Sequence, residues 1–212
     1  GYHVERLARA GLIGLGFTNA PASIAPSGGK TPIIGTNPFA LAVPGKHDDA
    51  AFVIDQSASV VAKSEIIMHA KEGKPIPRGW GLDADGQPTS DANIALKGSM
   101  LPSGGYKGFG VGLLVETLAA ALTGAMLGKD ASPFSGTKGG PPKTGQFFIA
   151  ISPNQFSGDL FTSRIEELTK GIVSQPGARM PGKRRQTNRE HHKRNGVSVC
   201  KDLLKRIQTF AS

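Results

Sequence analysis

A glycine-rich segment with one cation, residues 101–110 (LPSGGYKGFG), is the stretch of this chain best suited to hold a ligand. Glycine lets a backbone come close to a bound molecule and adopt positive φ. Lys107 lies among these glycines and can bind a phosphate as a point charge. The spacing is neither GxGxxG nor GxxxxGKS/T, so neither common nucleotide loop applies. The segment predicts an anion or cofactor site without identifying the ligand.

Two further segments of the sequence, at predicted turns, carry polar or charged residues that could bind a ligand. Asp55, Gln56 and Ser57 lie where a predicted strand passes into a helix, and the free N–H groups of a helix start favour an anion. The basic turn at 179–185 can clamp a phosphate, because guanidinium groups bind phosphate oxygens in pairs. Each group also has a simple alternative: Asp55 can cap the helix, and the basic residues can be solvated.

The histidines provide no catalytic pattern. His69 has no second ligand four residues further on, and His191 and His192 lie among arginines and lysines. His47 is predicted in a turn, without a partner at the spacing of a metal site. The sequence shows neither a nucleophile elbow nor a Ser-His-Asp arrangement. The residues alone therefore predict a ligand-binding chain without an evident acid–base group, and no metal site.

The composition is that of a globular protein. The 212 residues are 38% hydrophobic and 19% charged, which is enough for one core or one domain with an appendage. The single cysteine, Cys200, excludes an intrachain disulfide. The longest apolar run, 111–127, contains Glu116 and is too short for a membrane-spanning helix, so it predicts a buried core helix. No signal peptide is visible, and we expect no membrane partner.

The net charge of +9 is concentrated after residue 178. A basic cluster of this kind is one signature of nucleic-acid binding. However, almost no aromatic residues lie among these cations, so bases would have little to stack on. We favour a solvated basic helix and expect no nucleic-acid partner, although a basic nucleic-acid-binding module stays an alternative.

Hydrophobic patterning predicts alternating strands and helices. We expect strands at 12–17, 39–43, 51–54 and 146–152 and an edge strand at 197–199. We expect helices over 4–12, 60–70, 111–127 and 160–172, another after the turn at 181–185, and a terminal helix at 202–210. Ser57 and Ser59 are expected to cap the helix at 60–70. Asp83–Gly86 is expected to form a turn, and Asp91 to start a short helix. Adjacent strands joined by long loops indicate an α/β or α+β fold with a mixed, largely antiparallel sheet flanked by helices.

Six blocks, in order along the whole chain, are similar to one known family. They are GTNPFALAVPG at 35–45, FVIDQSASVVA at 52–62, GWGLDADGQPTSD at 79–91, LPSGGYKGFGVGLLVETLAAALTGA at 101–125, GQFFIAISP at 145–153 and RMPGKRR at 179–185. Together they resemble the malate/L-lactate/ureidoglycolate dehydrogenase family, which also contains the Δ1-piperideine-2-carboxylate/Δ1-pyrroline-2-carboxylate reductases. Each block alone is weak, but six in order are specific.

The resemblance implies a non-Rossmann NAD(P)-binding fold and a cytoplasmic homodimer. It divides the chain into an NAD(P)-binding domain, 1–155, and a C-terminal helical segment, 156–212. That segment is expected to pack against an N-terminal helical region that this chain does not contain. We therefore expect an N-terminally truncated member of the family.

The resemblance also implies which residues form the site. Thr36 would contact the substrate. Glu65 stands where the imino-acid reductases usually have an Asp that supports the catalytic pair, and where other members have Lys. The expected cofactor-binding residues, for NADP or NAD, are Asp55, Gln56, Ser57, Lys63, Ser64, Tyr106, Lys107, Arg179, Met180, Pro181, Gly182, Lys183, Arg184 and Arg185. The basic residues among them are expected to favour NADP.

The chain also departs from the family pattern. The Ser-His catalytic pair, a substrate-binding Arg and a His-containing segment are missing from it, and Gln56 and Ser57 replace the commoner Met-Ala. The parent protein is expected to be an NAD(P)-dependent oxidoreductase that transfers hydride to or from C2 of a small 2-oxo or 2-hydroxy acid or a cyclic 2-imino acid. RMPGKRR and GGPPKTGQ favour the imino-acid reductases slightly. This fragment is expected to be inactive alone.

Overall fold

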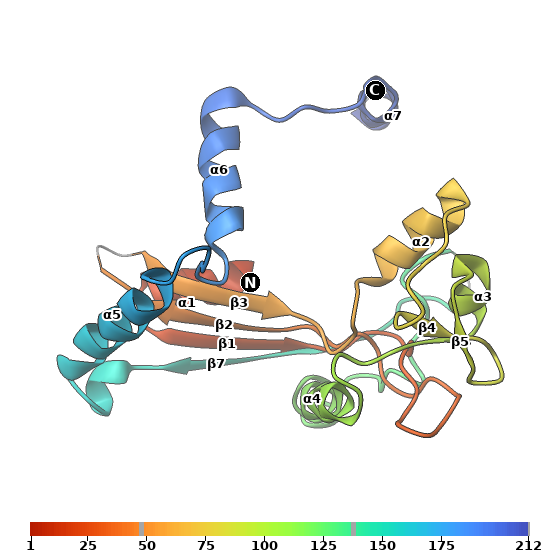
Figure 1. The fold of residues 1–212 in the computed structure, drawn as a ribbon, viewed down its shortest axis with the longest axis horizontal. Helices are drawn as coiled ribbons and strands as arrows, with labels where there is room; N and C mark the ends of the chain where they lie inside the picture. Colours follow the sequence, from red (N-terminus) through yellow and green to blue (C-terminus); the bar gives the residue numbers. More distant parts are fainter. Residues whose placement is uncertain (47–48, 137–138, 212) are drawn as a thin grey trace.

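The computed structural model describes residues 1–46, 49–136 and 139–211 (Figure 1). The turn predicted at His47 lies outside the described residues. The first half contains α1 (Tyr2–Arg9), β1 (Ile13–Thr18), β2 (Phe39–Pro44), β3 (Ala50–Gln56), α2 (Lys63–Glu72), β4 (Gly81–Leu82), β5 (Pro88–Thr89), α3 (Ala92–Lys97) and β6 (Ser99–Met100). The second half contains α4 (Tyr106–Glu116), the π-helical turn η1 (Thr117–Ala121), β7 (Gln146–Ile151), the 3-10 turn η2 (Pro153–Gln155), α5 (Leu160–Val173), α6 (Lys183–Asn195) and α7 (Lys201–Ala211).

A four-stranded sheet in the order β3-β2-β1-β7 forms the centre of the molecule, and every pairing in it is antiparallel. The glycines of β1 allow α1 to lie close to the sheet. A Cβ on Gly14 would meet the Val4 carbonyl oxygen at 2.9 Å, and one on Gly16 would meet Val4 Cγ1 at 3.0 Å. Val4 is therefore buried between helix and sheet. The predicted antiparallel sheet is confirmed.

A second, three-stranded sheet (β5-β4-β6) lies beside α2 and α3, at the other end of the molecule (Figure 1). Its core contains Ile24, Ile34 and Ile66. The turn predicted at Asp83–Gly86 connects β4 to β5, and Asp83 Oδ1 accepts a hydrogen bond from the amide of Gln87 at 2.8 Å. The sequence did not predict these strands, because two residues are too few for an alternating pattern.

The predicted start of the helix at 60–70, and its capping by Ser57 and Ser59, were wrong. α2 begins at Lys63, and no side chain caps it. Ser59 bridges to the loop at 101–105, and the amide of Val60 donates to the Leu101 carbonyl at 3.0 Å, so the chain stays extended there. Ser57 and Ser59 hydrogen bond to each other at 3.0 Å instead of capping the helix.

Two other expectations also need correction. The apolar run at 111–127 contributes to a helix that begins earlier, at Tyr106, and changes to π-helical geometry at Thr117. It is not buried all round, because Leu113 and Leu114 are exposed. The segment 197–199 is not a strand.

The C-terminal part is attached differently from the rest. α5, α6 and α7 contain no buried residue. α6 projects from the β3 side of the sheet, and α7 lies away from the main body (Figure 1). No helix in the described part of the chain is long and apolar enough to cross a membrane. The division of the chain at residue 155 stays a prediction.

Candidate functional site

An open cavity of about 480 Å³ lies between the end of β3 and the start of α4. We call it the α4 cavity. Gln56, Ser57 and Lys107 line it, so the structure brings together two groups that are 50 residues apart in the sequence. The residues that line it are Phe39, Gln56, Ser57, Ala58, Ser59, Val60, Val61, Ala62, Ser103, Lys107, Gly108 and Val111.

Backbone hydrogen bonds on both sides fix the segment after β3 that lines the α4 cavity. The amide of Ala58 donates to the Thr36 carbonyl at 2.8 Å, and the amide of Ser103 donates to the Ala58 carbonyl at 2.8 Å. The segment that follows β3 is thus fixed between the turn at 35–38 and the glycine-rich loop. Thr36 is half-buried and does not line the α4 cavity, but its carbonyl holds Ala58, which does.

A buried polar cluster, which the sequence reasoning missed, ties the turn at 35–38 to α4. Asn37 is fully buried and has a φ of 41°. Its Nδ2 donates to Glu116 Oε2 at 2.8 Å and to the Gly112 carbonyl at 2.9 Å. Glu116 Oε1 accepts from the amide of Gly128 at 2.6 Å. A carboxylate inside an otherwise apolar helix was the available signal, because a buried charge needs such partners.

A second open cavity, of about 460 Å³, adjoins the first on the other side of Gln56, which lines both. We call it the arginine cavity. It lies between the end of β3 and the basic turn that precedes α6. The residues that line it are Val53, Ile54, Asp55, Gln56, Arg179, Pro181, Gly182, Arg184 and Arg185.

The basic turn is fixed against β3 by its backbone. The amide of Val53 donates to the Pro181 carbonyl at 3.2 Å. Gly182 has a φ of 83°, and a Cβ there would meet the Val53 carbonyl oxygen at 2.9 Å. Only glycine fits such a position without strain. Met180 is buried beside it, so Met180, Pro181 and Gly182 shape the turn.

The two adjacent arginines of this turn have different surroundings. Arg185 Nη1 donates to Asp55 Oδ2 at 2.6 Å, and the amino group of Gly1 lies 3.1 Å from the same oxygen. Burial raises the pKa of Asp55, but hydrogen bonds from the Gly1 amino group and Arg185 outweigh it and hold that pKa below its ordinary value. Within the described residues Arg184 makes no ion pair, although it lines the cavity. Among the described residues, Arg184, like Arg179, is therefore free to meet a ligand, whereas Arg185 is engaged with Asp55.

Other expected site residues lie outside both cavities. Lys63, Ser64 and Glu65 occupy the first turn of α2 and are exposed, and Tyr106 is 69% exposed at the start of α4. Lys183 is exposed, with its Nζ 3.4 Å from Gln186 Oε1. Among the described residues, no group of three or more His, Cys, Asp or Glu side chains could hold a metal ion.

Comparison with known proteins identifies the class to which this fold and site correspond. The family model for malate/L-lactate dehydrogenase matches residues 1–208, and the chain belongs to that family. It is 46% identical over 185 residues to the (2R)-3-sulfolactate dehydrogenase (NADP(+)) of Chromohalobacter salexigens, covering 87% of this chain and 55% of that protein. It is 42% identical over 207 residues to a Δ1-pyrroline-2-carboxylate/Δ1-piperideine-2-carboxylate reductase of Pseudomonas aeruginosa, covering 96% of this chain and 61% of that protein.

Solved structures agree with this assignment. The Δ1-piperideine-2-carboxylate reductase of Pseudomonas syringae superposes with a TM-score of 0.89 at 34% identity, covering 97% of this chain and 62% of that one. The sulfolactate dehydrogenase of Methanocaldococcus jannaschii gives 0.84 at 33% identity, covering 96% and 59%. The resemblance seen in the sequence is confirmed, and the chain spans between 55% and 61% of the length of the two curated relatives above.

Proposed function

We propose that the complete protein is an NAD(P)-dependent oxidoreductase that transfers hydride to or from C2 of a small 2-oxo or 2-hydroxy acid or a cyclic 2-imino acid. The observation that carries the proposal is the pair of adjoining cavities that share Gln56, with Lys107 in one and Arg179, Arg184 and Arg185 in the other. Two neighbouring cavities that both contain cations suit a dinucleotide, because its pyrophosphate is negatively charged and NADP carries a further phosphate on its adenosine ribose. The relatives named above, one of them an NADP(+) enzyme, support the same reading.

We place the adenosine end, with the ribose phosphate that NADP has and NAD lacks, in the arginine cavity and the nicotinamide half in the α4 cavity. Arg184 and Arg179 suit the phosphate-rich end, since guanidinium groups bind phosphate in paired hydrogen bonds. Thr36, proposed to contact the substrate, accepts a hydrogen bond from Ala58, which lines the α4 cavity together with Lys107. The cofactor, when bound, supplies or accepts the hydride, and the protein supplies orientation and charge.

We propose that this chain by itself binds the cofactor without turning over substrate. No histidine lines either cavity in the part of the chain that the structure describes. Glu65 is exposed and lies outside both cavities, so its supporting role also stays a proposal. The homodimer, the cytoplasmic location and the packing of residues 156–212 against a further helical region are proposed on the family resemblance alone.

The choice between NADP and NAD can be tested with Arg184→Ala. We expect the Kd for NADPH, measured by calorimetry, to rise about tenfold, or about 1.4 kcal/mol, because one charge-assisted contact is lost. The Kd for NADH should change less than about twofold. Arg194→Ala removes the same charge from an exposed position of α6 and serves as the control. Equal losses for NADPH and NADH would refute the proposed selectivity.

The same measurement separates the two alternatives. An inert fragment would bind neither nucleotide. A nucleic-acid-binding module would bind oligonucleotides with an affinity that falls steeply as salt rises, and would ignore NADPH. The structure weakens that alternative, because Arg185 and Arg189 of the basic segment are engaged with Asp55 and Glu5.

A further inference from the structure

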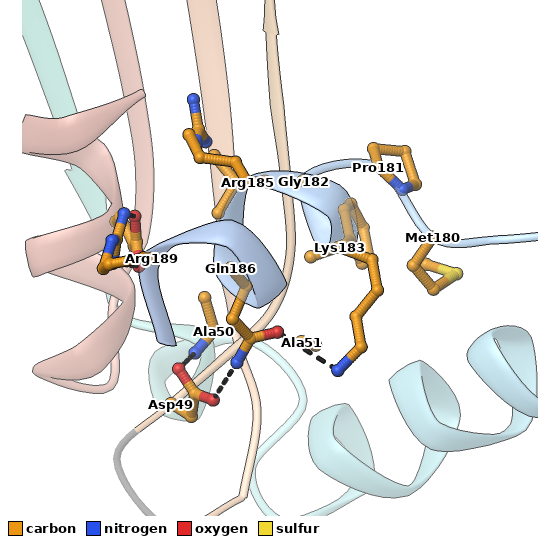
Figure 2. A pocket seen from close by; sticks show the side chains of 13 residues that line it. Asp49, Ala50, Ala51, Met180, Pro181, Gly182, Lys183, Arg185, Gln186 and Arg189 are labelled. Carbon is orange, nitrogen blue, oxygen red and sulfur yellow. Dashed lines mark hydrogen bonds and ion pairs between the residues drawn. The ribbon is translucent and has the colours of Figure 1, made fainter. Parts of the chain in front are cut away.

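Three polar side chains near the start of α6 hold the helix to the rest of the molecule, and Figure 2 shows one of them, Gln186, reaching Asp49. Arg185 and Gln186 lie four and three residues before Arg189, spacings that bring each of them near Arg189 on the helix surface, while Arg185 and Gln186 themselves point to different partners. Arg185 binds Asp55 at the end of β3. The other two anchors lie further along the helix, beyond the arginine cavity.

The strongest anchor joins α6 to α1. Arg189 Nη1 donates to Glu5 Oε1 at 2.6 Å, and Nη2 donates to Oε2 at 2.8 Å. Glu5 is only 7% exposed, and Arg9 also reaches it at 3.1 Å. This paired geometry fixes the direction of the guanidinium group as well as its distance. A buried carboxylate that lost Arg189 would keep only one partner.

Gln186 provides a second anchor nearby. Its Nε2 donates to Asp49 Oδ2 at 2.8 Å, while Asp49 Oδ1 accepts from the amide of Ala50 at the start of β3 (Figure 2). The space left beneath the helix is about 30 Å³, room for little more than one water molecule. α6 is thus held closely against β3 and α1 in this region.

We propose that Glu5 and Arg189 are positioning residues for the cofactor phosphates, because they set the direction of α6 and thereby the place of Arg184. This inference rests on the proposed function. Gly182, at the start of α6, has a positive φ and no side chain, so it can act as a pivot. The Glu5–Arg189 pair fixes the middle of α6, and Arg184 lies between Gly182 and this anchor. Neither positioning residue lines the arginine cavity.

The test compares Arg189→Met with the matched control Arg194→Met, which removes the same charge from an exposed position on the same helix. We expect Arg189→Met to raise the Kd for NADPH about fivefold and the Kd for NADH less than about twofold. Arg189→Lys should recover part of the NADPH affinity, since it restores one charge–charge contact without the fork. The Arg194→Met control should bind both nucleotides as the unaltered chain does.

Hydrogen exchange without nucleotide gives an independent readout. We expect the amides of residues 183–189 to exchange faster in Arg189→Met than in the unaltered chain or in the Arg194→Met control. Glu5→Gln removes the other charge of the same pair and should have the same effect on exchange as Arg189→Met. It replaces Arg189→Met in the test if that variant does not fold. Circular dichroism checks that each variant is folded.

The outcomes are distinct. If the unaltered chain binds no NADPH, the proposed function fails, while hydrogen exchange still decides whether the pair holds α6. Unchanged exchange in Arg189→Met would overturn the anchoring. NADPH affinity that is unchanged, or that falls equally for NADH, would overturn the positioning of Arg184.

Discussion

Two helices that meet at Glu5 and Arg189, α1 and α6, are held to the protein by different forces. α1 buries Val4 and Ala8 against the sheet, each only 1% exposed, beside Ala40 and Ala42. α6 buries no residue and is held by polar contacts at Asp55, Asp49 and Glu5. Apolar burial of α1 depends little on moderate changes of pH and ionic strength, whereas the charged contacts of α6 are weakened by both. The part of the proposed site that carries the arginines is therefore the adjustable part.

The largest expected effect tests the apolar side of this comparison. Val4→Ala should lower the free energy of unfolding by about 2–3 kcal/mol, since it removes buried methyl groups and leaves a cavity beneath α1. Urea unfolding followed by circular dichroism measures it. Leu168→Ala on α5, where the side chain is exposed, is the control and should change little. A loss below about 0.5 kcal/mol in Val4→Ala would mean that α1 is not held by burial.

A smaller effect is expected for the polar side. Glu5→Gln should lower the free energy of unfolding by about 1–2 kcal/mol at pH 7, because the charge that Arg189 and Arg9 hydrogen bond is lost, and both arginines are partly exposed to water. Glu167→Gln on α5 removes an exposed carboxylate and should be neutral within about 0.5 kcal/mol.

The pH dependence sharpens that prediction. The hydrogen bonds from Arg189 hold the pKa of Glu5 below its ordinary value, against the opposing effect of burial. The stabilisation is therefore complete above the unfolded-state pKa of about 4.3 and is lost as the pH falls through the folded value. The difference in unfolding free energy between the unaltered chain and Glu5→Gln should shrink below about pH 4. A difference that grows as the pH falls would contradict the assignment.

The smallest effect is expected for α7. All its described residues are exposed. Removing residues 197–212 should change the free energy of unfolding by less than about 0.5 kcal/mol, the range of ordinary surface changes. Thermal unfolding of the shortened chain would show this. A loss of several degrees in Tm would mean that α7 packs against the body.

The sequence predicted the elements that have long, regular patterns. The strands near 39–43 and 146–152 and the helix near 160–172 were found, because each carries an uninterrupted run of apolar or amphipathic residues. β4, β5 and β6 were missed because each has only two residues, too few for an alternating pattern. The start of α2 was misplaced because it depends on a distant partner, since the bridge from Ser59 to Pro102 keeps the chain extended.

The site was predicted in part. Local composition pointed to Lys107 and to the basic turn, and the structure places both on adjoining cavities. Local composition could not show that Arg184 and Arg185 differ, because only Arg185 pairs with Asp55, which is 130 residues away in the sequence. The Glu5–Arg189 pair spans 184 residues and has no local signal at all. Such contacts arise only when the helices have been packed.

The hydrogen bond from Val53 to Pro181 has one more consequence. β3 is the outermost strand of the main sheet on its side, and its free N–H and C=O groups could pair with a strand of another molecule. The Pro181 carbonyl occupies one of these groups, and Gly182 packs so closely on Val53 that no foreign strand could lie there. Changes that loosen the basic turn should therefore also make the protein more prone to aggregate. The same backbone contacts therefore cover this edge of β3 and fix the basic turn.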